Sequence, residues 1–184
     1  MCGIAGFWRN TSDQTTDWLE ETASAMADTL VHRGPDDSGT WVDPEVGIAF
    51  GHRRLSIIDT SDAGHQPMIS ADGRYVIIYN GEVYNFQELR QELEKKGHLF
   101  FGHSDTEVML AAFVQWGVEK SVKQFNGMFA FAVWDRRDRL LWLARDRIGE
   151  KPLYYGVQNG TLFFASELKA IRANPKFKPE IDRD

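Results

Sequence analysis

Apolar positions recur along the chain with the periods of helices and strands. Between residues 16 and 33 they return every three or four positions until Gly34 and Pro35, which predicts an amphipathic helix. Residues 47–59 and 74–80 are rich in β-branched and aromatic side chains and are bounded by Gly, Asp and Pro. This composition predicts strands. The first half of the chain is therefore expected to combine one helix with at least two strands.

Capping signals predict two further helices. Asn85, with Glu88 three positions later, matches a capping box ahead of a helical segment. Ser104 and Glu107 repeat the same pattern before an apolar segment that ends at Gly117. We expect a helix to begin at each of these boxes.

A series of short apolar segments separated by turn-forming residues predicts a strand meander in the second half of the chain, followed by a short helix over 167–172. The expected strands are 128–134, 140–144, 153–157 and 161–165. Several of them, such as MFAFAVW and LLWLA, are apolar on both faces, so we expect both faces to be covered. The pattern favours layered sheets enclosed between helices, an α+β fold.

Composition limits the function classes. The 184 residues, 42% of them hydrophobic, suffice for one well-filled domain. The net charge of -6 provides no basic surface for nucleic acid or an anionic membrane, and no apolar run is long enough to span a bilayer. The first residues lack the features of a secretory signal, and a single cysteine cannot form an internal disulfide. We therefore expect a cytoplasmic protein without nucleic-acid or membrane partners.

The only cysteine, Cys2, directly follows Met1. If Met1 is removed, the thiol gains the free α-amine as a built-in base, because an α-amine titrates near pH 7.7–8.0 and is partly neutral in the cell. The alternative is that Cys2 is a small buried residue of an apolar first strand. Position alone does not decide between the two.

Asn80 and Gly81 follow a predicted strand. This dipeptide commonly forms a two-residue hairpin turn, but the chain runs on into the Asn85 capping box and offers no second strand. An Asn amide beside a Gly N–H can instead provide the two donors of an oxyanion hole, where we expect Gly81 to supply a permissive φ angle.

Several charged residues have both structural and functional interpretations. Adjacent strand residues point to opposite faces, so only Arg53 or Arg54 can face a given site, where a guanidinium suits a carboxylate ligand. Asp105 lies where a helix dipole favours an acid, and could also be the counter-ion of an ammonium group. The histidines lack the spacing of metal ligands, so no metal site is expected.

The charged loops HRGPD (32–36) and RDRIGEKPLYY (145–155) are expected to be structural. We expect their arginines to pair with Asp36, Asp146 or Glu150.

Sequence motifs across nearly the whole chain resemble the glutaminase domain of glutamine-dependent asparagine synthetases. In order they are Cys-Gly-Ile at 2–4, His-Arg-Gly-Pro-Asp at 32–36, Arg-Leu-Ser-Ile-Ile-Asp at 54–59, Asn-Gly-Glu-Val-Tyr-Asn at 80–85, Ser-Asp-Thr-Glu at 104–107, Asn-Gly-Met-Phe-Ala-Phe-Ala at 126–132, Arg-Asp-Arg-Ile-Gly-Glu-Lys-Pro-Leu-Tyr-Tyr at 145–155 and Phe-Ala-Ser-Glu-Leu-Lys-Ala at 164–170. The resemblance implies a class II amidotransferase with an N-terminal nucleophile and a four-layer αββα fold.

The resemblance also implies residue roles. It makes Cys2 the nucleophile that attacks the side-chain amide of L-glutamine, and Asn80 and Gly81 the oxyanion hole. It implies that Arg54 binds the α-carboxylate. The implied ligands of the α-ammonium are Glu82 and Asp105, and the backbone implied to line the pocket is that of Leu55, Ser56, Ile57 and Ile58.

Asparagine synthetases carry a larger ATP-dependent synthetase domain with an SGG-x-DS loop, and these residues contain neither that motif nor a P-loop. We therefore expect residues 1–184 to be the glutaminase domain, either excised from a longer protein or standing alone beside a synthetase subunit that receives its ammonia. No cofactor is expected in this domain, whereas ATP and magnesium would serve the absent one. The sequence leaves the acceptor and the oligomeric state undecided, a homodimer included.

Two alternatives remain. The chain could be the glutaminase domain of another class II amidotransferase, although the Phe-Ala-Phe-Ala and Lys-Pro-Leu-Tyr-Tyr segments favour the asparagine synthetase branch. It could also be a non-catalytic glutamine sensor or docking module, if Met1 stays attached and the amine is lost in a peptide bond.

Overall fold

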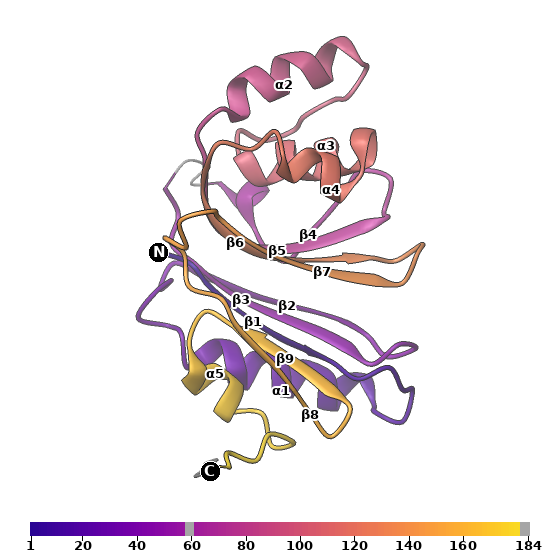
Figure 1. The fold of residues 1–184 in the computed structure, drawn as a ribbon, viewed down its shortest axis with the longest axis vertical. Coiled ribbons are helices and arrows are strands. Elements are labelled where there is room, and N and C mark those ends of the chain that lie inside the picture. Colours follow the sequence, from indigo (N-terminus) through magenta and orange to yellow (C-terminus); the bar gives the residue numbers. More distant parts are fainter. Residues whose placement is uncertain (58–60, 181–184) are drawn as a thin grey trace.

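Two antiparallel sheets stack face to face, with helices on both outer faces, in the computed structural model, which describes residues 1–57 and 61–180 (Figure 1). The first sheet has the strand order β2-β3-β1-β9-β8 and the second β4-β5-β6-β7. Helices α1 and α5 cover the first sheet, α3 and α4 cover the second, and α2 packs against α3 on the side away from the sheet (Figure 1). The predicted α+β fold with four αββα layers is confirmed.

The strands of the first sheet are β1 (Gly3–Trp8), β2 (Asp37–Asp43), β3 (Ile48–Arg54), β8 (Tyr154–Gln158) and β9 (Thr161–Ala165). Those of the second sheet are β4 (Met68–Ile69), β5 (Tyr75–Val83), β6 (Gly127–Asp135) and β7 (Leu140–Arg145). The helices are α1 (Thr16–Asp28), α2 (Phe86–Lys95), α3 (Asp105–Trp116), α4 (Val118–Val122) and α5 (Leu168–Arg172), with a 3-10 turn η1 (Asp62–Gly64).

Strand alternation divides the core into layers. On β5, Val76 and Ile78 belong to the apolar layer between the sheets, whereas Ile77 and Tyr79 pack under the helices of the second sheet. We call the layer between the sheets the inter-sheet core. Its buried members are Ile4, Val46, Ile48, Phe50, Val76, Ile78, Ala130, Ala132, Trp134 and Phe164.

Several element boundaries differ from prediction. Helix α1 ends at Asp28, where the Thr29 hydroxyl donates to Met26 O, so residues 29–33 lie outside it. Strand β5 continues through Asn80 and Gly81 to Val83, which confirms that this dipeptide does not form a hairpin turn. Strand β2 and helix α4 carry no signal that the sequence patterns above detected.

Of the two predicted N-cap residues, only Ser104 makes the capping hydrogen bond. The Ser104 hydroxyl accepts from the Glu107 N–H, and the helix ends at Gly117 with φ +81°, as predicted. Asn85 makes no capping bond, because its side chain instead accepts from the Asn126 N–H and donates to Gln124 O. The Glu107 carboxylate likewise accepts N–H groups of the preceding loop rather than closing a box.

The predicted meander is wrong as a single sheet. Strands β6 and β7 extend the second sheet, but the chain then crosses to the first sheet, where β9 pairs with β1 and β8 with β9. The prediction that both faces are covered is confirmed for β6. Strand β7 lies at the edge of its sheet and is only half-buried.

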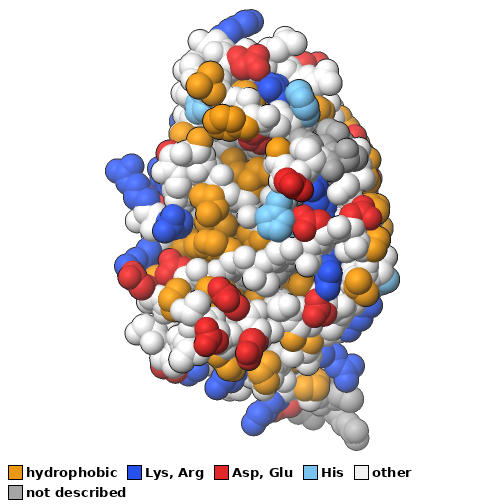
Figure 2. Space-filling view, turned by 180° about the vertical axis from the view of Figure 1, so that it is seen from behind, with side chains coloured by type: hydrophobic (Ala, Val, Ile, Leu, Met, Phe, Trp, Pro, Cys, Tyr) orange, Lys and Arg blue, Asp and Glu red, His pale blue; other side chains and the backbone are white. Residues whose placement is uncertain are grey.

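The surface carries no continuous field of one sign on the face seen in Figure 2, where acidic, basic and apolar side chains are interspersed. None of the helices in residues 1–57 and 61–180 has the length and apolar character needed to cross a membrane.

Candidate functional site

At one end of the sandwich the inter-sheet core gives way to polar side chains. Alternation places Cys2 in phase with Ile4, Arg54 with Phe50, and Asn80 with Ile78. These polar positions line a cavity of about 130 Å³. The strand faces that form the inter-sheet core therefore also position the side chains of the cavity.

Most of the predicted site residues meet at this cavity. Those that line it are Cys2, Arg54, Leu55, Ile57, Asn80, Gly81, Glu82 and Asp105. Ser56 does not, and its N–H instead donates to the Asp36 carboxylate at 2.8 Å. Ile58 lies outside the described residues, so its predicted contact stays a prediction.

The Cys2 thiol lies against the backbone of Leu55, whose N–H donates to Sγ at 3.4 Å. Burial raises the pKa of the Cys2 thiol, and the bond to Leu55, the terminal ammonium and Arg54 oppose that increase. The thiol is thus protonated near neutral pH and needs a base to become a nucleophile. While Met1 is attached, Cys2 has no free α-amine to act as that base. The terminal ammonium then belongs to Met1 and donates to Arg33 O at 3.2 Å.

Asn80 is buried, 1% exposed, and its amide nitrogen has no hydrogen-bond partner among the described residues. A buried donor of this kind costs free energy unless a ligand satisfies it. The next residue, Gly81, does not have the positive φ that the sequence suggested. Glycine is required for a different reason, since a Cβ atom would lie 2.3 Å from the carbonyl oxygen of Met128 on the paired strand.

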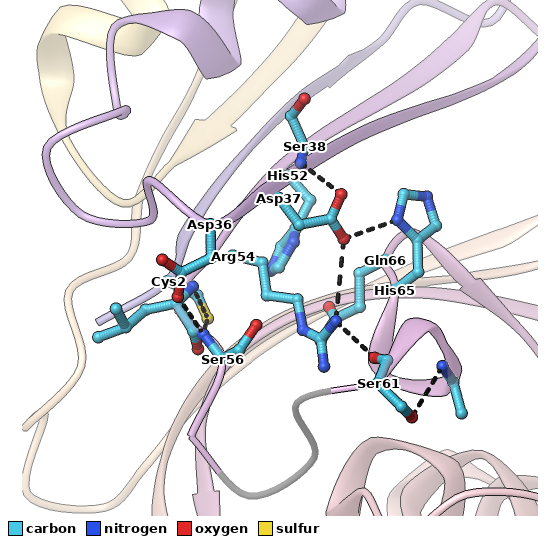
Figure 3. A network of polar contacts seen from close by, with 12 residues as sticks. Cys2, Asp36, Asp37, Ser38, His52, Arg54, Ser56, Ser61, His65 and Gln66 are labelled. Carbon is cyan, nitrogen blue, oxygen red and sulfur yellow. Dashed lines mark hydrogen bonds and ion pairs between the residues drawn. The ribbon is translucent and has the colours of Figure 1, made fainter.

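The two arginines at the end of β3 separate as strand alternation requires. Arg54 lines the cavity, where its Nη1 atom donates to Ser61 O at 2.9 Å and lies 3.9 Å from Asp37 Oδ2 (Figure 3). Arg53 points to the other face and pairs with Asp28 at the end of α1. The structure therefore selects Arg54 as the guanidinium of the cavity, a choice that the residue pattern alone left open.

Two acids approach the cavity from different elements. Asp105, in the first turn of α3, accepts from the Tyr79 hydroxyl at 2.7 Å and from the Val83 N–H at 2.9 Å. Burial raises the pKa of Asp105, and these hydrogen bonds oppose the rise. Glu82 lies on β5 and is half-buried. Hydrogen bonds thus connect Asp105 to β5. Its position at the start of a helix had suggested only an interaction with the helix dipole.

The cavity lining also includes residues that the sequence patterns did not predict for the site, among them Gln66 and Lys151. Gln66 accepts from the Tyr79 N–H at 2.7 Å and donates to Thr106 at 3.3 Å, so it links β5 to α3. Lys151 is 6% exposed, and its Nζ atom lies 3.4 Å from Met1 Sδ. Its loop carried a signal, a dense run of charge and glycine, but that signal did not reveal where the lysine points.

The ion pairs expected in the charged loops do not form. Arg145 donates to the carbonyl oxygens of Gly149 and Lys151. Asp146 accepts N–H groups of Phe129, Glu150 and Lys151, and Arg33 pairs with Glu167 rather than Asp36. In the second loop, backbone carbonyl and N–H groups bind Arg145 and Asp146 in place of an ion pair. In the described ranges, no group of three or more His, Cys, Asp or Glu side chains could hold a metal ion.

Comparison with known proteins extends these findings. A family model described as the glutamine amidotransferase domain matches residues 1–184. The chain is 46% identical over 185 residues to the glutamine-hydrolysing asparagine synthetase 3 of Bacillus subtilis, covering all of this chain and 29% of that protein. It is 48% identical over 172 residues to asparagine synthetase 1 of the same organism, covering 93% of this chain and 26% of the relative. The chain thus spans less than a third of these relatives.

The fold also matches a solved structure. The glutamine phosphoribosylpyrophosphate amidotransferase of B. subtilis superimposes with a TM-score of 0.77 at 22% identity, over 94% of this chain and 43% of that enzyme. At this identity the likeness concerns the fold alone. The fold, the cavity and the match along the whole chain lead to one assignment: the chain belongs to the glutamine amidotransferase domain family.

Proposed function

We propose that this domain hydrolyses the side-chain amide of L-glutamine to glutamate and ammonia through a thioester on Cys2. The observation that carries the proposal is the presence, in one cavity, of the Cys2 thiol and of an amide nitrogen on Asn80 that is buried and unpaired within the described residues. A nucleophile and an unsatisfied donor are the components that acyl transfer through an oxyanion requires.

The proposed reaction starts from a chain whose first residue is Cys2. Its α-amine takes the thiol proton, directly or through a water, and the thiolate attacks the side-chain carbonyl carbon of glutamine. The Asn80 amide and the Gly81 N–H stabilise the oxyanion, and ammonia leaves with the proton held by the amine. Water then hydrolyses the glutamyl thioester through a second oxyanion, which releases glutamate and restores the thiol. Side chains and the terminal amine suffice for this chemistry, so we propose no cofactor in this domain.

Recognition of glutamine is proposed to use the other end of the ligand. The Arg54 guanidinium suits the α-carboxylate, whereas the carboxylates of Glu82 and Asp105 suit the α-ammonium. The segment 55–58 is proposed to line the pocket, with Leu55 and Ile57 as the cavity-lining members in the described part. This division leaves the amide free to meet Cys2.

Ammonia from this domain is proposed to serve ATP-dependent asparagine synthesis by a synthetase domain or subunit, which would hold ATP and magnesium. The support is the 46% identity to a protein named for glutamine-hydrolysing asparagine synthesis, of which this chain covers 29%. A cytoplasmic location and a homodimer remain part of the same proposal.

A second candidate function is a glutamine sensor. Met1 lines the cavity, and the nitrogen atom of Cys2 is a peptide nitrogen while Met1 is attached. Such a chain keeps the side chains proposed to bind glutamine but lacks the free α-amine proposed as the base.

The test measures glutamate release from glutamine by preparations whose first residue is established by intact mass. A chain starting at Cys2 should be active, and Asn80→Ala should lower kcat by about 10²–10³-fold, the usual effect of losing one oxyanion donor. Gly156→Ala is a matched control, because a Cβ atom there meets nothing within 4 Å. Glutamine binding without hydrolysis by the processed chain would favour the sensor instead.

A further inference from the structure

Residues distant in the sequence hydrogen-bond to the first residues of the chain and fix their position. Arg33 Nε donates to Cys2 O at 3.0 Å, so the carbonyl of the proposed nucleophile residue is fixed by a side chain. On β1, Ile4 exchanges two hydrogen bonds with Ser166: its N–H donates to the Ser166 hydroxyl at 3.1 Å and its carbonyl accepts from the Ser166 N–H at 2.8 Å. The segment around Ser166 therefore has a fixed register relative to β1.

The residue after Ser166, Glu167, fixes Arg33. Glu167 Oε1 lies 3.0 Å from Arg33 Nη1, and the arginine side chain is 10% exposed. The same carboxylate meets His32 at 3.0 Å and Lys169 at 3.1 Å. Burial would raise the pKa of Glu167, but hydrogen bonds from Arg33, Lys169 and His32 outweigh it and lower the pKa to about 2. Glu167 is thus anionic at any working pH.

We propose that Glu167 is a positioning residue for the Cys2 nucleophile, acting through Arg33. Glu167 does not line the cavity, so it has no direct contact with glutamine there. Its contacts lead from the carboxylate to the guanidinium and from there to the Cys2 carbonyl. Nucleophilic attack requires a near-attack geometry, and a displacement of about 1 Å can cost on the order of 10²-fold in rate. This inference rests on the proposed function.

The experiment compares Glu167→Gln, Arg33→Gln and the double variant, each confirmed by mass to begin at Cys2. Asp28→Asn is the matched control, because it removes the carboxylate partner of Arg53 and neither of these two residues lines the cavity. Glu167→Gln should lower kcat for glutamine hydrolysis about tenfold or more, with KM changed by less than about threefold. The double variant should be no slower than Arg33→Gln alone, because the two residues act as one unit. The control should match the wild type.

A glutamine-independent readout separates the two proposals. Alkylation of Cys2 by iodoacetamide, followed by intact mass, should be faster in Glu167→Gln, since a loosened N-terminal segment exposes the half-buried thiol. Unchanged kcat together with unchanged alkylation in Glu167→Gln, or losses that add fully in the double variant, would overturn the positioning role. A wild-type chain that is alkylated but never hydrolyses glutamine would overturn the proposed function, and a variant alkylated faster than that wild type would still support positioning.

Discussion

The Cys2 sulfur and the Leu55 backbone contact each other twice, with the Leu55 N–H 3.4 Å from Sγ and the Leu55 carbonyl oxygen 3.7 Å from it. Cys2 directly precedes β1 and Leu55 directly follows β3, and Gly3 pairs with Arg53 between these strands. The antiparallel ladder thus sets where the thiol lies. It also places Arg54, one residue before Leu55, on the same cavity.

Replacing Cys2 by serine should abolish glutamine hydrolysis and leave binding largely intact, because Arg54 and the cavity carboxylates are proposed to recognise the other end of glutamine. A serine hydroxyl is far less nucleophilic than a thiol under the same base. Hydrolysis rates and calorimetric titration with glutamine measure the two effects. More than a small residual rate in the serine variant would refute the assignment of the nucleophile.

Arg54→Lys should raise KM for glutamine by about 10- to 100-fold, because lysine keeps the charge but cannot form the bidentate contact, and a bond to a charged group is worth about 1.5–3 kcal/mol. Arg53→Lys should be nearly silent, since that side chain pairs with Asp28 on the other face. Steady-state kinetics of both variants test the pair. The reverse order would contradict the proposed facing of β3.

Gly64→Ala should affect the same interaction from a distance. A Cβ atom on Gly64 would lie 2.0 Å from Arg54 Nη2, the end of a flexible side chain that can shift at little cost to the fold. We therefore expect KM to rise while the melting temperature changes little. An unchanged KM would mean that glutamine binding tolerates a displaced guanidinium.

Retaining Met1 should remove activity without changing any side chain of the cavity. A chain extended ahead of Met1 should fold and carry Cys2, Asn80 and Arg54, yet form no thioester, because a peptide nitrogen cannot accept the thiol proton. In the processed chain the acidic limb of the pH profile should report the Cys2 amine and persist in histidine variants. Comparable rates for two mass-verified preparations, one with and one without Met1, would place the base elsewhere.

His52 should make the fold sensitive to mild acid. It is fully buried, its Nε2 atom donates to Tyr79 O at 3.0 Å, and burial lowers its pKa from 6.5 to about 4. As pH falls from 6.5 to 4, the unfolded chain takes up a proton that the folded chain excludes, which destabilises the fold by about 3 kcal/mol. Urea unfolding between pH 7 and 4.5 should show a smaller loss of stability for His52→Gln. Equal slopes in both proteins would contradict this role.

Local patterns determined much of the fold. Residue composition located β3 and β5, a short apolar segment between turn-forming residues located β6, and a capping box located α3, because these signals lie in consecutive residues. Motif order along the chain was sufficient to identify Cys2, Asn80 and Arg54 as candidate site residues. Which element pairs with which is not written locally, and so the predicted meander did not show that β8 and β9 join a different sheet from β6 and β7.

Alternation separated Arg53 from Arg54 but did not say which one faces the site. Both faces of β3 are buried: Phe50 packs between the sheets, while Gly51 lies against α1, where a Cβ atom would meet Ala23 O at 2.5 Å. A strand buried on both faces gives no polar-against-apolar contrast to orient it. Only the stacking of the second sheet on one of these faces made Arg54 the inward residue.

The longest contacts were beyond any sequence pattern. Arg33 and Glu167 lie 134 positions apart and carry charges that could have been satisfied by nearer partners such as Asp36. Their pairing exists because β9 adds to the free edge of β1 and brings the following residues beside the N-terminus. The sequence by itself thus determined which chemical groups are available and the local elements that carry them. Tertiary structure decided which of those groups meet, because strand pairing and sheet stacking depend on burying apolar faces that are distant in the chain.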